Sequence, residues 1–194
     1  MTNDLSNPAY QLNILFGNLQ GAHVTCEIWW VYKNSEDRPK YVDVLQRYYF
    51  FFKSSIHAQF LATVMGISRL FDRRRGTISV KNLLKAIHKS GQISSSQFSK
   101  LEKDLNKLEP LEKKVRTLRN KAFAHITKEK TYHEVFNEAK IAHDHIRDLL
   151  DKTMVFLNRI ACLIGIDEHG FISEGARDTR RVLEDLKHAT IKDP

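Results

Sequence analysis

Cysteine is scarce in this chain, with only Cys26 and Cys162 among 194 residues. The two lie far apart and neither belongs to a CxxC pair, so the sequence predicts neither a disulfide framework nor a zinc site. No other metal or cofactor is expected. Unpaired cysteines are typical of a reducing compartment, and we therefore expect a cytoplasmic protein.

Glycine and proline are also few, at eight and four residues. Turn signals are therefore rare, which favours long helices with few connections over a sandwich or barrel. The hydrophobic content of 42% is ample for a packed core, and 194 residues fit one domain, 1–194, that ends in a C-terminal helix and polar tail at 173–194. We expect an all-α bundle of long antiparallel helices.

Long apolar runs are missing as well. The most apolar late stretch, 154–166, contains Asn158 and Arg159 and is too short to cross a bilayer of about 30 Å. The first residues lack a basic region followed by an apolar run, so no secretory signal is expected. The sequence predicts neither membrane association nor export.

Positive charge, by contrast, is in excess. Lys and Arg number 31 against 23 Asp and Glu, which gives a formal net charge of +8. Such a surface favours a polyanionic partner, because binding to phosphates releases counterions, and nucleic acid is the obvious candidate. The alternative is a soluble basic protein, since charge alone does not separate the two.

The first third of the chain predicts two long helices. Segment 6–8, Ser-Asn-Pro, signals the start of the first, which should end near residue 33. Gly17 and Gly21 within it either permit close helix packing or weaken the helix. The second is expected to run unbroken over 40–72, at the centre of the bundle, because apolar residues cover much of its circumference.

Aromatic and polar residues in the second predicted helix have two interpretations each. Tyr49, Phe50 and Phe51 suit a core or a dimer contact, and less readily a platform for stacked bases. Ser55 could hold a phosphate or a catalytic side chain, or could bond back to its own helix carbonyl.

A basic turn should follow this helix. Arg73, Arg74 and Arg75 are adjacent, and Gly76 can adopt the left-handed backbone that ends a helix. The three cations either grip a phosphate backbone or form a solvated loop.

Further helices are predicted at 80–89, from Ser94 with a capping start, and again after Pro110, where a kink or restart is expected. A capping box at Thr131 should open one long helix that continues to near Gly165.

Two features near the C-terminus complete the pattern. His143 and His145 diverge on a helix and lack a third ligand, so we interpret them as a solvated pair rather than a metal site. The last helix is expected over 174–188, with Val182, Leu183 and Leu186 as its apolar contact.

The strongest functional signal is the segment 115–125. Its helical spacing turns Arg119 and Asn120 away from the core, and His125 follows within the same segment. Arg119 offers a planar fork that suits phosphate oxygens, and His125 can exchange protons near neutral pH. Arg116 and Lys121 extend the positive strip. The residue types suit phosphodiester chemistry.

At these residues the sequence resembles the HEPN superfamily, whose signature is an Arg, usually followed by a polar residue, and a His after four to six intervening positions. Arg119-Asn120-(KAFA)-His125 fits this pattern. The wider helical stretch, including the segment 68–72, is similar to the AbiU-type abortive-infection branch. The resemblance implies a metal-independent endoribonuclease in bacterial phage defence or a toxin-antitoxin system.

A single continuous helix would place Arg119 and His125 about 120° apart around its axis. Either the helix loosens before His125, or a second copy of the chain completes the site. The second option agrees with the composite cleft of a homodimer that the resemblance implies.

In the RNase interpretation, His125 transfers the proton, Arg119 stabilises the charge on the phosphate, and Asn120 orients the phosphate or the imidazole. Arg116 and Lys121 would hold the flanking RNA backbone. The competing interpretation is a helical module that binds nucleic acid or an acidic partner, such as a cognate antitoxin or inhibitor, without catalysis. A related toxin branch carries a modified Tyr two positions after the His, whereas this chain has Thr127, so that regulation should not be transferred. A nucleotidyltransferase is a weak third option, because no Gly-Ser signature with paired acidic residues follows a strand pattern.

Overall fold

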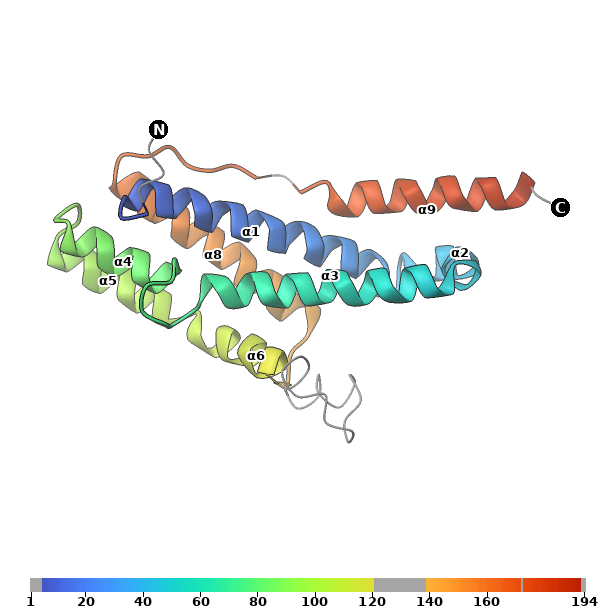
Figure 1. Cartoon of the computed structure of the whole chain (residues 1–194), viewed down its shortest axis with the longest axis horizontal. Helices are drawn as coiled ribbons and strands as arrows, with labels where there is room; N and C mark the ends of the chain where they lie inside the picture. Colours follow the sequence, from blue (N-terminus) through green and yellow to red (C-terminus); the bar gives the residue numbers. More distant parts are fainter. Residues whose placement is uncertain (1–4, 121–138, 172, 193–194) are drawn as a thin grey trace.

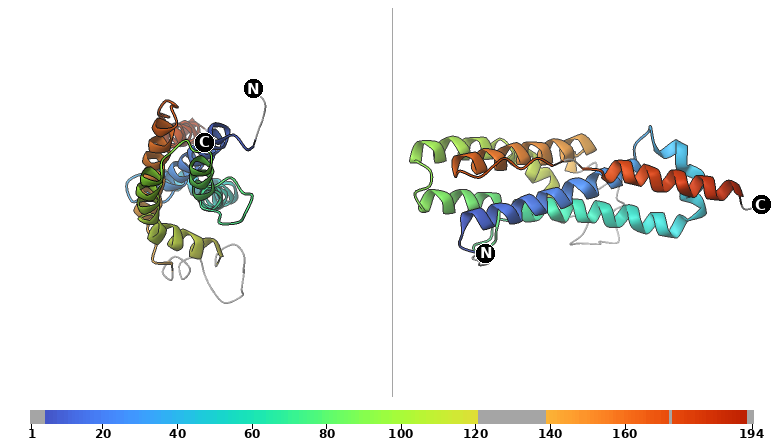
Figure 2. Two further views of the ribbon diagram at one scale, coloured as in Figure 1. Left: turned by 90° about the vertical axis from the view of Figure 1, so that its left-hand side faces the viewer. Right: turned by 90° about the horizontal axis from the view of Figure 1, so that it is seen from above.

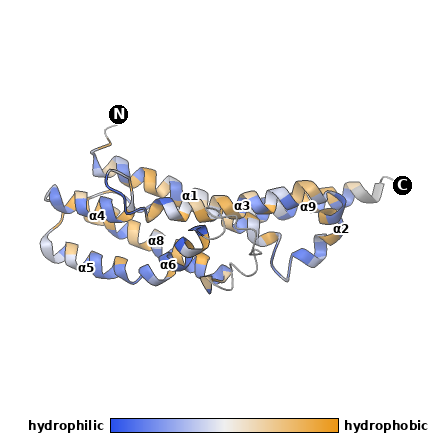
Figure 3. Ribbon diagram, turned by 60° about the horizontal axis from the view of Figure 1, so that its bottom comes forward, coloured by the Kyte–Doolittle hydropathy of each residue, from blue (hydrophilic) through white to orange (hydrophobic). Residues whose placement is uncertain are grey.

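The computed structural model describes residues 5–120, 139–171 and 173–192 (Figure 1), and within them every regular element is a helix. The prediction of an all-α fold is confirmed. The molecule is elongated (Figure 2). Helices α4 (Val80–Lys89) and α5 (Ser95–Asn106) lie toward one end, and α2 (Val42–Arg47) and α9 (Gly175–Lys192) toward the other. Along α4 and α5, hydrophobic and hydrophilic residues alternate at helical spacing, so each helix has one face suited to the core (Figure 3).

Helix α1 (Pro8–Val31) lies at the centre of this arrangement, where it contacts α3 (Tyr49–Leu70), α4, α8 (His143–Leu163) and α9. The Oδ1 atom of Asn7 accepts the N–H of Ala9 at 2.9 Å, and Pro8 occupies the first turn, as the sequence predicted. The expectation that the second long helix would be central was wrong, because α1 contacts α3, α4, α8 and α9, whereas α3 packs mainly on α1 and α6 (Glu109–Arg119).

The closest approach of α1 to α3 depends on Gly66 rather than on the two glycines of α1. A Cβ atom added at Gly66 would meet the Cβ of Ala22 at 3.0 Å, which is tighter than ordinary packing. A Cβ atom at Gly17 or Gly21 would meet nothing within 4 Å. Of the two interpretations of Gly17 and Gly21, close packing is therefore excluded.

The second predicted helix is divided into three pieces. A 3-10 turn, η1 (Arg38–Tyr41), leads into α2 (Val42–Arg47), and α3 (Tyr49–Leu70) follows after a break at Tyr48, whose φ of −107° and ψ of 43° are not helical. The break allows Tyr41, Val44 and Leu45 to face a second core beneath α9. The prediction of one unbroken helix was wrong, because local hydrophobic spacing does not reveal a change of packing partner.

The middle of the chain follows its local signals closely. Helices α4 (Val80–Lys89), α5 (Ser95–Asn106) and α6 (Glu109–Arg119) have the predicted order. Ser94 and Gln97 form the full capping box at the start of α5. The predicted restart is also confirmed, with Pro110 in the first turn of α6.

Helix α8 (His143–Leu163) begins later than predicted. Lys140 has a positive φ of 47°, which interrupts any helix that runs through this point. The Nδ1 atom of His145 accepts the N–H of Ala142 at 3.0 Å and so caps the new start. Thr131, where the long helix was expected to begin, lies outside the described residues. The predicted end near Gly165 is confirmed by the left-handed φ of 72° at that residue.

The interpretation of His143 and His145 as a solvated pair was wrong. The ring of His143 is buried and stacks on Trp30, with centroids 3.7 Å apart and planes 7° from parallel. Burial lowers the pKa of His143, which favours the neutral ring in this contact.

The last helix, α9 (Gly175–Lys192), runs beyond the predicted end at residue 188. Leu183 is buried in the second core and Leu186 packs against it, as expected. Val182 was misassigned, because 55% of it is exposed.

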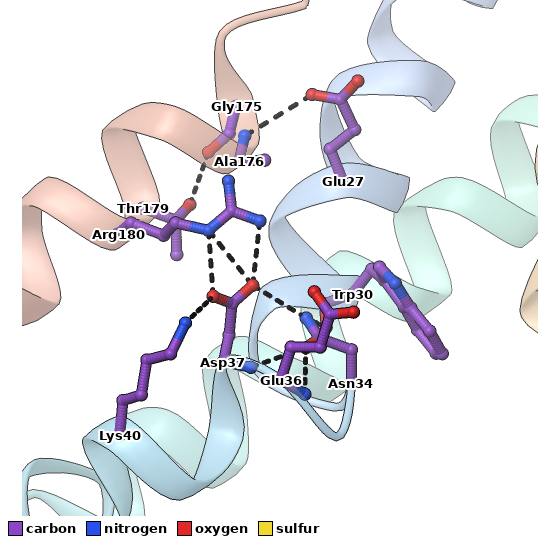
Figure 4. A network of polar contacts seen from close by, with 10 residues as sticks. All are labelled: Glu27, Trp30, Asn34, Glu36, Asp37, Lys40, Gly175, Ala176, Thr179 and Arg180. Atoms are coloured by element: carbon purple, nitrogen blue, oxygen red, sulfur yellow. Dashed lines mark hydrogen bonds and ion pairs between the residues drawn. The ribbon is translucent and has the colours of Figure 1, made fainter.

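A partly buried ion pair fastens α9 to the segment after α1 (Figure 4). Both carboxylate oxygens of Asp37 accept hydrogen bonds from Arg180, at 2.8 to 3.1 Å, and Asn34 donates another at 2.9 Å. The Asp37 side chain is only 5% exposed, whereas that of Arg180 is 46% exposed. The hydrogen bonds from Arg180 lower the pKa of Asp37 to about 2.

This pair predicts a pH-dependent stability. Because the folded pKa of Asp37 lies below its unfolded value, its contribution is complete well above the unfolded pKa and disappears as the pH falls through about 2. We expect Asp37→Asn to lower the free energy of unfolding by roughly 2 kcal/mol at pH 7. Urea unfolding of both proteins at several pH values measures this difference, which should shrink between pH 4 and pH 2. Glu36→Gln is the matched control, since Glu36 is exposed beside the pair. A difference that stays constant with pH would contradict the role of the ion pair.

In the part of the chain that the structure describes, no helix is both long and apolar enough to cross a membrane.

Candidate functional site

The end of α6 carries the first two residues of the predicted motif. Glu109 and Glu112 lie in the first turn of α6 and Arg116 and Arg119 in its last, an order that complements the helix dipole. The residues that α6 buries are Glu112, Val115 and Leu118.

Arg119 and Asn120 are joined to each other. The Nε and Nη2 atoms of Arg119 donate to Oδ1 of Asn120 at 3.0 and 2.7 Å. Arg119 is half-buried and Asn120, the C-cap of α6, is exposed. Asn120 therefore holds one edge of the guanidinium fork, the edge with which an Arg commonly binds two oxygens of an anion.

Arg119 lines a pocket of about 140 Å³ between α6 and the end of α3. Three guanidinium groups and two carboxylates are among its lining residues, so the charged lining has an excess of one positive charge. The lining residues are Ile67, Ser68, Phe71, Asp72, Arg73, Glu112, Val115, Arg116 and Arg119.

Glu112 neutralises the other two cations of this pocket. Its side chain is 7% exposed and forms ion pairs with Arg73 at 3.1 Å and with Arg116 at 3.0 Å. Arg73 also pairs with Glu109 at 2.8 Å, and this hydrogen bond raises the pKa of Arg73. Among the described residues Arg119 has no carboxylate within ion-pair distance. Its charge is thus the one best placed to bind an incoming anion.

The predicted basic turn is less open than its sequence indicates. Arg74 pairs with Asp72 at 2.7 Å, and this contact lowers the pKa of Asp72. With Arg73 held by two glutamates, only Arg75 of the three is exposed without a carboxylate partner in the described ranges. The turn can contribute fewer free charges to a nucleic-acid surface than three adjacent arginines suggest.

The remaining predicted site residues lie elsewhere or outside the described chain. Ser55 is hydrogen-bonded to the side chain of Tyr32 and lies more than three helical turns before Ser68 on α3, so it is not part of the Arg119 pocket. Lys121 and His125 fall in the segment 121–138, outside the described residues, as does Thr127.

Glu112 and Asp72 are the site residues that sequence reasoning missed. Glu112 lies four residues before Arg116 and seven before Arg119, so the three share one side of α6, and this spacing could have identified the acid. Asp72 belongs to a different helix end, and no sequence spacing reveals that it meets α6.

The described residues contain no cluster of three or more His, Cys, Asp or Glu side chains suited to a metal ion.

Comparison with known proteins identifies the family. The HEPN_AbiU2 family model, described as AbiU2, matches residues 14–182. The chain belongs to the HEPN_AbiU2 family. The resemblance inferred from the Arg119 to His125 motif is therefore confirmed, together with the link to abortive infection. No curated protein and no solved structure matches the chain significantly. The HEPN_AbiU2 match includes the end of α3 and all of α6, which together line the Arg119 pocket, and it ends at Val182 in α9.

Proposed function

We propose that this HEPN_AbiU2 protein is an endoribonuclease that cleaves RNA by attack of the 2′-OH on its own phosphodiester, and that it acts in abortive infection or a toxin-antitoxin setting. The observation that carries the proposal is Arg119, a guanidinium that is held by Asn120 and lines a pocket whose other cations are already paired. Such a group is ready to bind a phosphate without first breaking an ion pair with the described carboxylates.

The chemistry requires little more than this charge and a proton carrier. The 2′-oxygen forms a bond to phosphorus as the bond from phosphorus to the 5′-oxygen breaks, which leaves a 2′,3′-cyclic phosphate and a 5′-OH. The 2′-OH loses a proton and the leaving oxygen gains one, and His125 is the motif residue suited to this transfer near neutral pH. Because the nucleophile belongs to the RNA, the mechanism needs no metal-activated water.

The working unit that we propose is a homodimer, in which His125 of one chain acts beside Arg119 of the other. A cognate antitoxin or inhibitor would block the same positive surface with an acidic segment. The inhibitor would bind around Arg119 and the exposed Arg75 beyond the pocket.

The direct test is incubation of the purified protein with end-labelled single-stranded RNA in EDTA. We expect cleavage that survives chelation, products with 2′,3′-cyclic phosphate ends, and no cleavage of DNA of the same sequence, which lacks the 2′-OH. The DNA strand is the matched control for binding without reaction. Cleavage that requires an added divalent metal would refute the mechanism. Salt-sensitive RNA binding without any cleavage would favour the non-catalytic module instead.

A further inference from the structure

A second cavity, of about 580 Å³, lies between α1, α8 and α9. Its volume falls in the range of small-molecule sites, and it shares no lining residue with the Arg119 pocket. We call it the α1–α8–α9 cleft and define it by His23, Glu27, Trp30, His143, Arg147 and Asp151. The Asp37–Arg180 ion pair fastens α9 beside it, because Arg180 also lines the cleft (Figure 4).

The inner wall of the cleft is aromatic and uncharged. Trp30 and His143 form the stacked pair described above, and His23 lies 6.0 Å from the ring of Phe171. Burial lowers the pKa of both His23 and His143, which favours the neutral form of both rings; Asp151, 3.8 Å from His23, acts in the opposite direction on that ring. This wall suits a flat, apolar ring system.

The cations of the cleft lie at its rim. The side chain of Arg147 is 68% exposed, and its contact with Asp151, at 3.9 Å, is at the limit of an ion pair. Arg177 is also 68% exposed, but it pairs with Glu174 and with Asp178 and is therefore less available to a ligand. Arg180 is held by Asp37 and is therefore less able to bind a ligand. Arg147 is therefore the arginine of the cleft best placed to bind the charged part of a ligand whose remaining part lies inside.

Glu27 adds a specific polar requirement. One of its carboxylate oxygens accepts the N–H of Ala176 at 3.4 Å, and Figure 4 shows the other oxygen directed away from that bond. A carboxylate only accepts hydrogen bonds, so a ligand that fits beside it must present N–H or O–H donors. A purely aliphatic anion would leave this acceptor unmatched, and inorganic phosphate would leave the aromatic wall empty.

We propose that the cleft binds a guanine nucleotide, with the base against the aromatic wall and Glu27 and the phosphate at Arg147. Guanine presents two adjacent donors, N1–H and the N2 amino group, to one carboxylate, whereas adenine places an acceptor, N1, beside its single amino donor. The site is separate from the Arg119 pocket and does not depend on ribonuclease activity.

The test is calorimetric titration of the full chain, free of RNA, with GMP, AMP, guanosine and inorganic phosphate. We expect GMP to bind at least about tenfold more tightly than AMP, because Glu27 would face an acceptor in adenine. Guanosine should bind about tenfold more weakly than GMP, because it lacks the charge-assisted bonds of the phosphate. Binding of GMP and inorganic phosphate with equal affinity would overturn the proposal, as would the absence of saturable GMP binding at about 1 mM.

Two variants separate the two contacts. Arg147→Gln should weaken GMP binding and leave guanosine binding unchanged, whereas Glu27→Gln should reduce the preference for GMP over AMP. Arg159→Gln is the matched control, since Arg159 lies on α8 outside the cleft and pairs with Asp104. Because Glu27 also contacts α9, the circular dichroism melt of each variant is compared with that of the original protein. GMP binding that is unaffected in both folded variants would refute the assignment.

Discussion

Replacing Arg119 by Ala is expected to lower the rate of RNA cleavage by about 100- to 1,000-fold, the loss typical when one preorganised group that stabilises transition-state charge is removed. The same variant should melt within a few degrees of the original protein. Among the described residues, the side-chain hydrogen bonds of Arg119 go only to the exposed Asn120, so their loss leaves no buried partner unsatisfied.

Two related variants test why the group must be an Arg with its charge available. Arg119→Lys keeps the charge but loses the planar fork, so we expect activity between that of the original protein and that of the Ala variant. Asn120→Asp places a carboxylate where Oδ1 now accepts both hydrogen bonds of Arg119, at 2.7 and 3.0 Å. That carboxylate would pair the cation and repel phosphate, so its effect should approach that of Arg119→Ala.

The control for total charge is Arg181→Ala, which removes one exposed arginine from α9 without touching the Arg119 pocket. Its activity should change little. Cleavage is measured as initial rates at fixed ionic strength, together with thermal melts of each protein. Equal losses in the Arg119 and Arg181 variants would indicate that general charge, rather than the site, is responsible. Full activity of a folded Arg119→Ala protein would refute the catalytic assignment.

Glu112 lines the Arg119 pocket and also holds two of its arginines in place. Its carboxylate is 7% exposed and joins Arg73 to Arg116, so its removal would leave two guanidinium groups without a shared partner. A loss of activity at Glu112 would therefore be accompanied by a loss of stability. This distinguishes it from Arg119, whose contribution is expected to be to the reaction.

The sequence predicted those elements whose ends are determined locally. Ser94 and Gln97 cap the start of α5, Pro110 occupies the first turn of α6, and the left-handed Gly165 follows the end of α8. Each of these signals acts within a few residues of its own position. The breaks at Tyr48 and at Lys140 were missed. Both occur in segments with helical hydrophobic spacing. At Tyr48 the break accompanies a change of packing partner to residues that are distant in sequence.

The same distinction applies to the candidate site. Arg119 and Asn120 were predicted as neighbours on one helix surface, and their mutual hydrogen bonds follow from that proximity. The pairing of Arg73 with Glu109 and Glu112 joins residues 36 and 39 positions apart. A run of three arginines therefore looked like a free basic surface, although the folded chain neutralises two of them.

The second large effect is expected from subunit mixing. Arg119→Ala and His125→Ala proteins should each be inactive alone. When the two are denatured together and refolded as a mixture, about a quarter of the original activity should return. Half of randomly paired dimers are mixed, and each mixed dimer has one intact composite site out of two. The reason is the angle of about 120° that a continuous helix would place between the two residues, which one chain cannot easily direct at one phosphate.

The structure also narrows the choice of dimer surface. Trp29 in α1 is only 6% exposed and packs on Phe60, so it cannot supply an apolar dimer contact. Phe50 and Phe51, at the start of α3, are 84% and 67% exposed. Exposed aromatic side chains of this kind favour an interaction surface over a core position. We therefore expect Phe50→Glu with Phe51→Glu, introduced in both chains, to prevent the recovery of activity on mixing.

Sedimentation of the same samples connects activity to assembly. The original protein and the refolded mixture should sediment as dimers at micromolar concentration, and the double Glu variant as a monomer with an unchanged circular dichroism spectrum. If the mixture stays inactive although mixed dimers form, Arg119 and His125 must act within one chain, because every mixed dimer would still contain one unmodified copy of each residue on opposite subunits. If the protein sediments only as a monomer and retains full cleavage activity, the dimer requirement is wrong, and a helix that loosens between Arg119 and His125 becomes the arrangement that brings both groups to one phosphate.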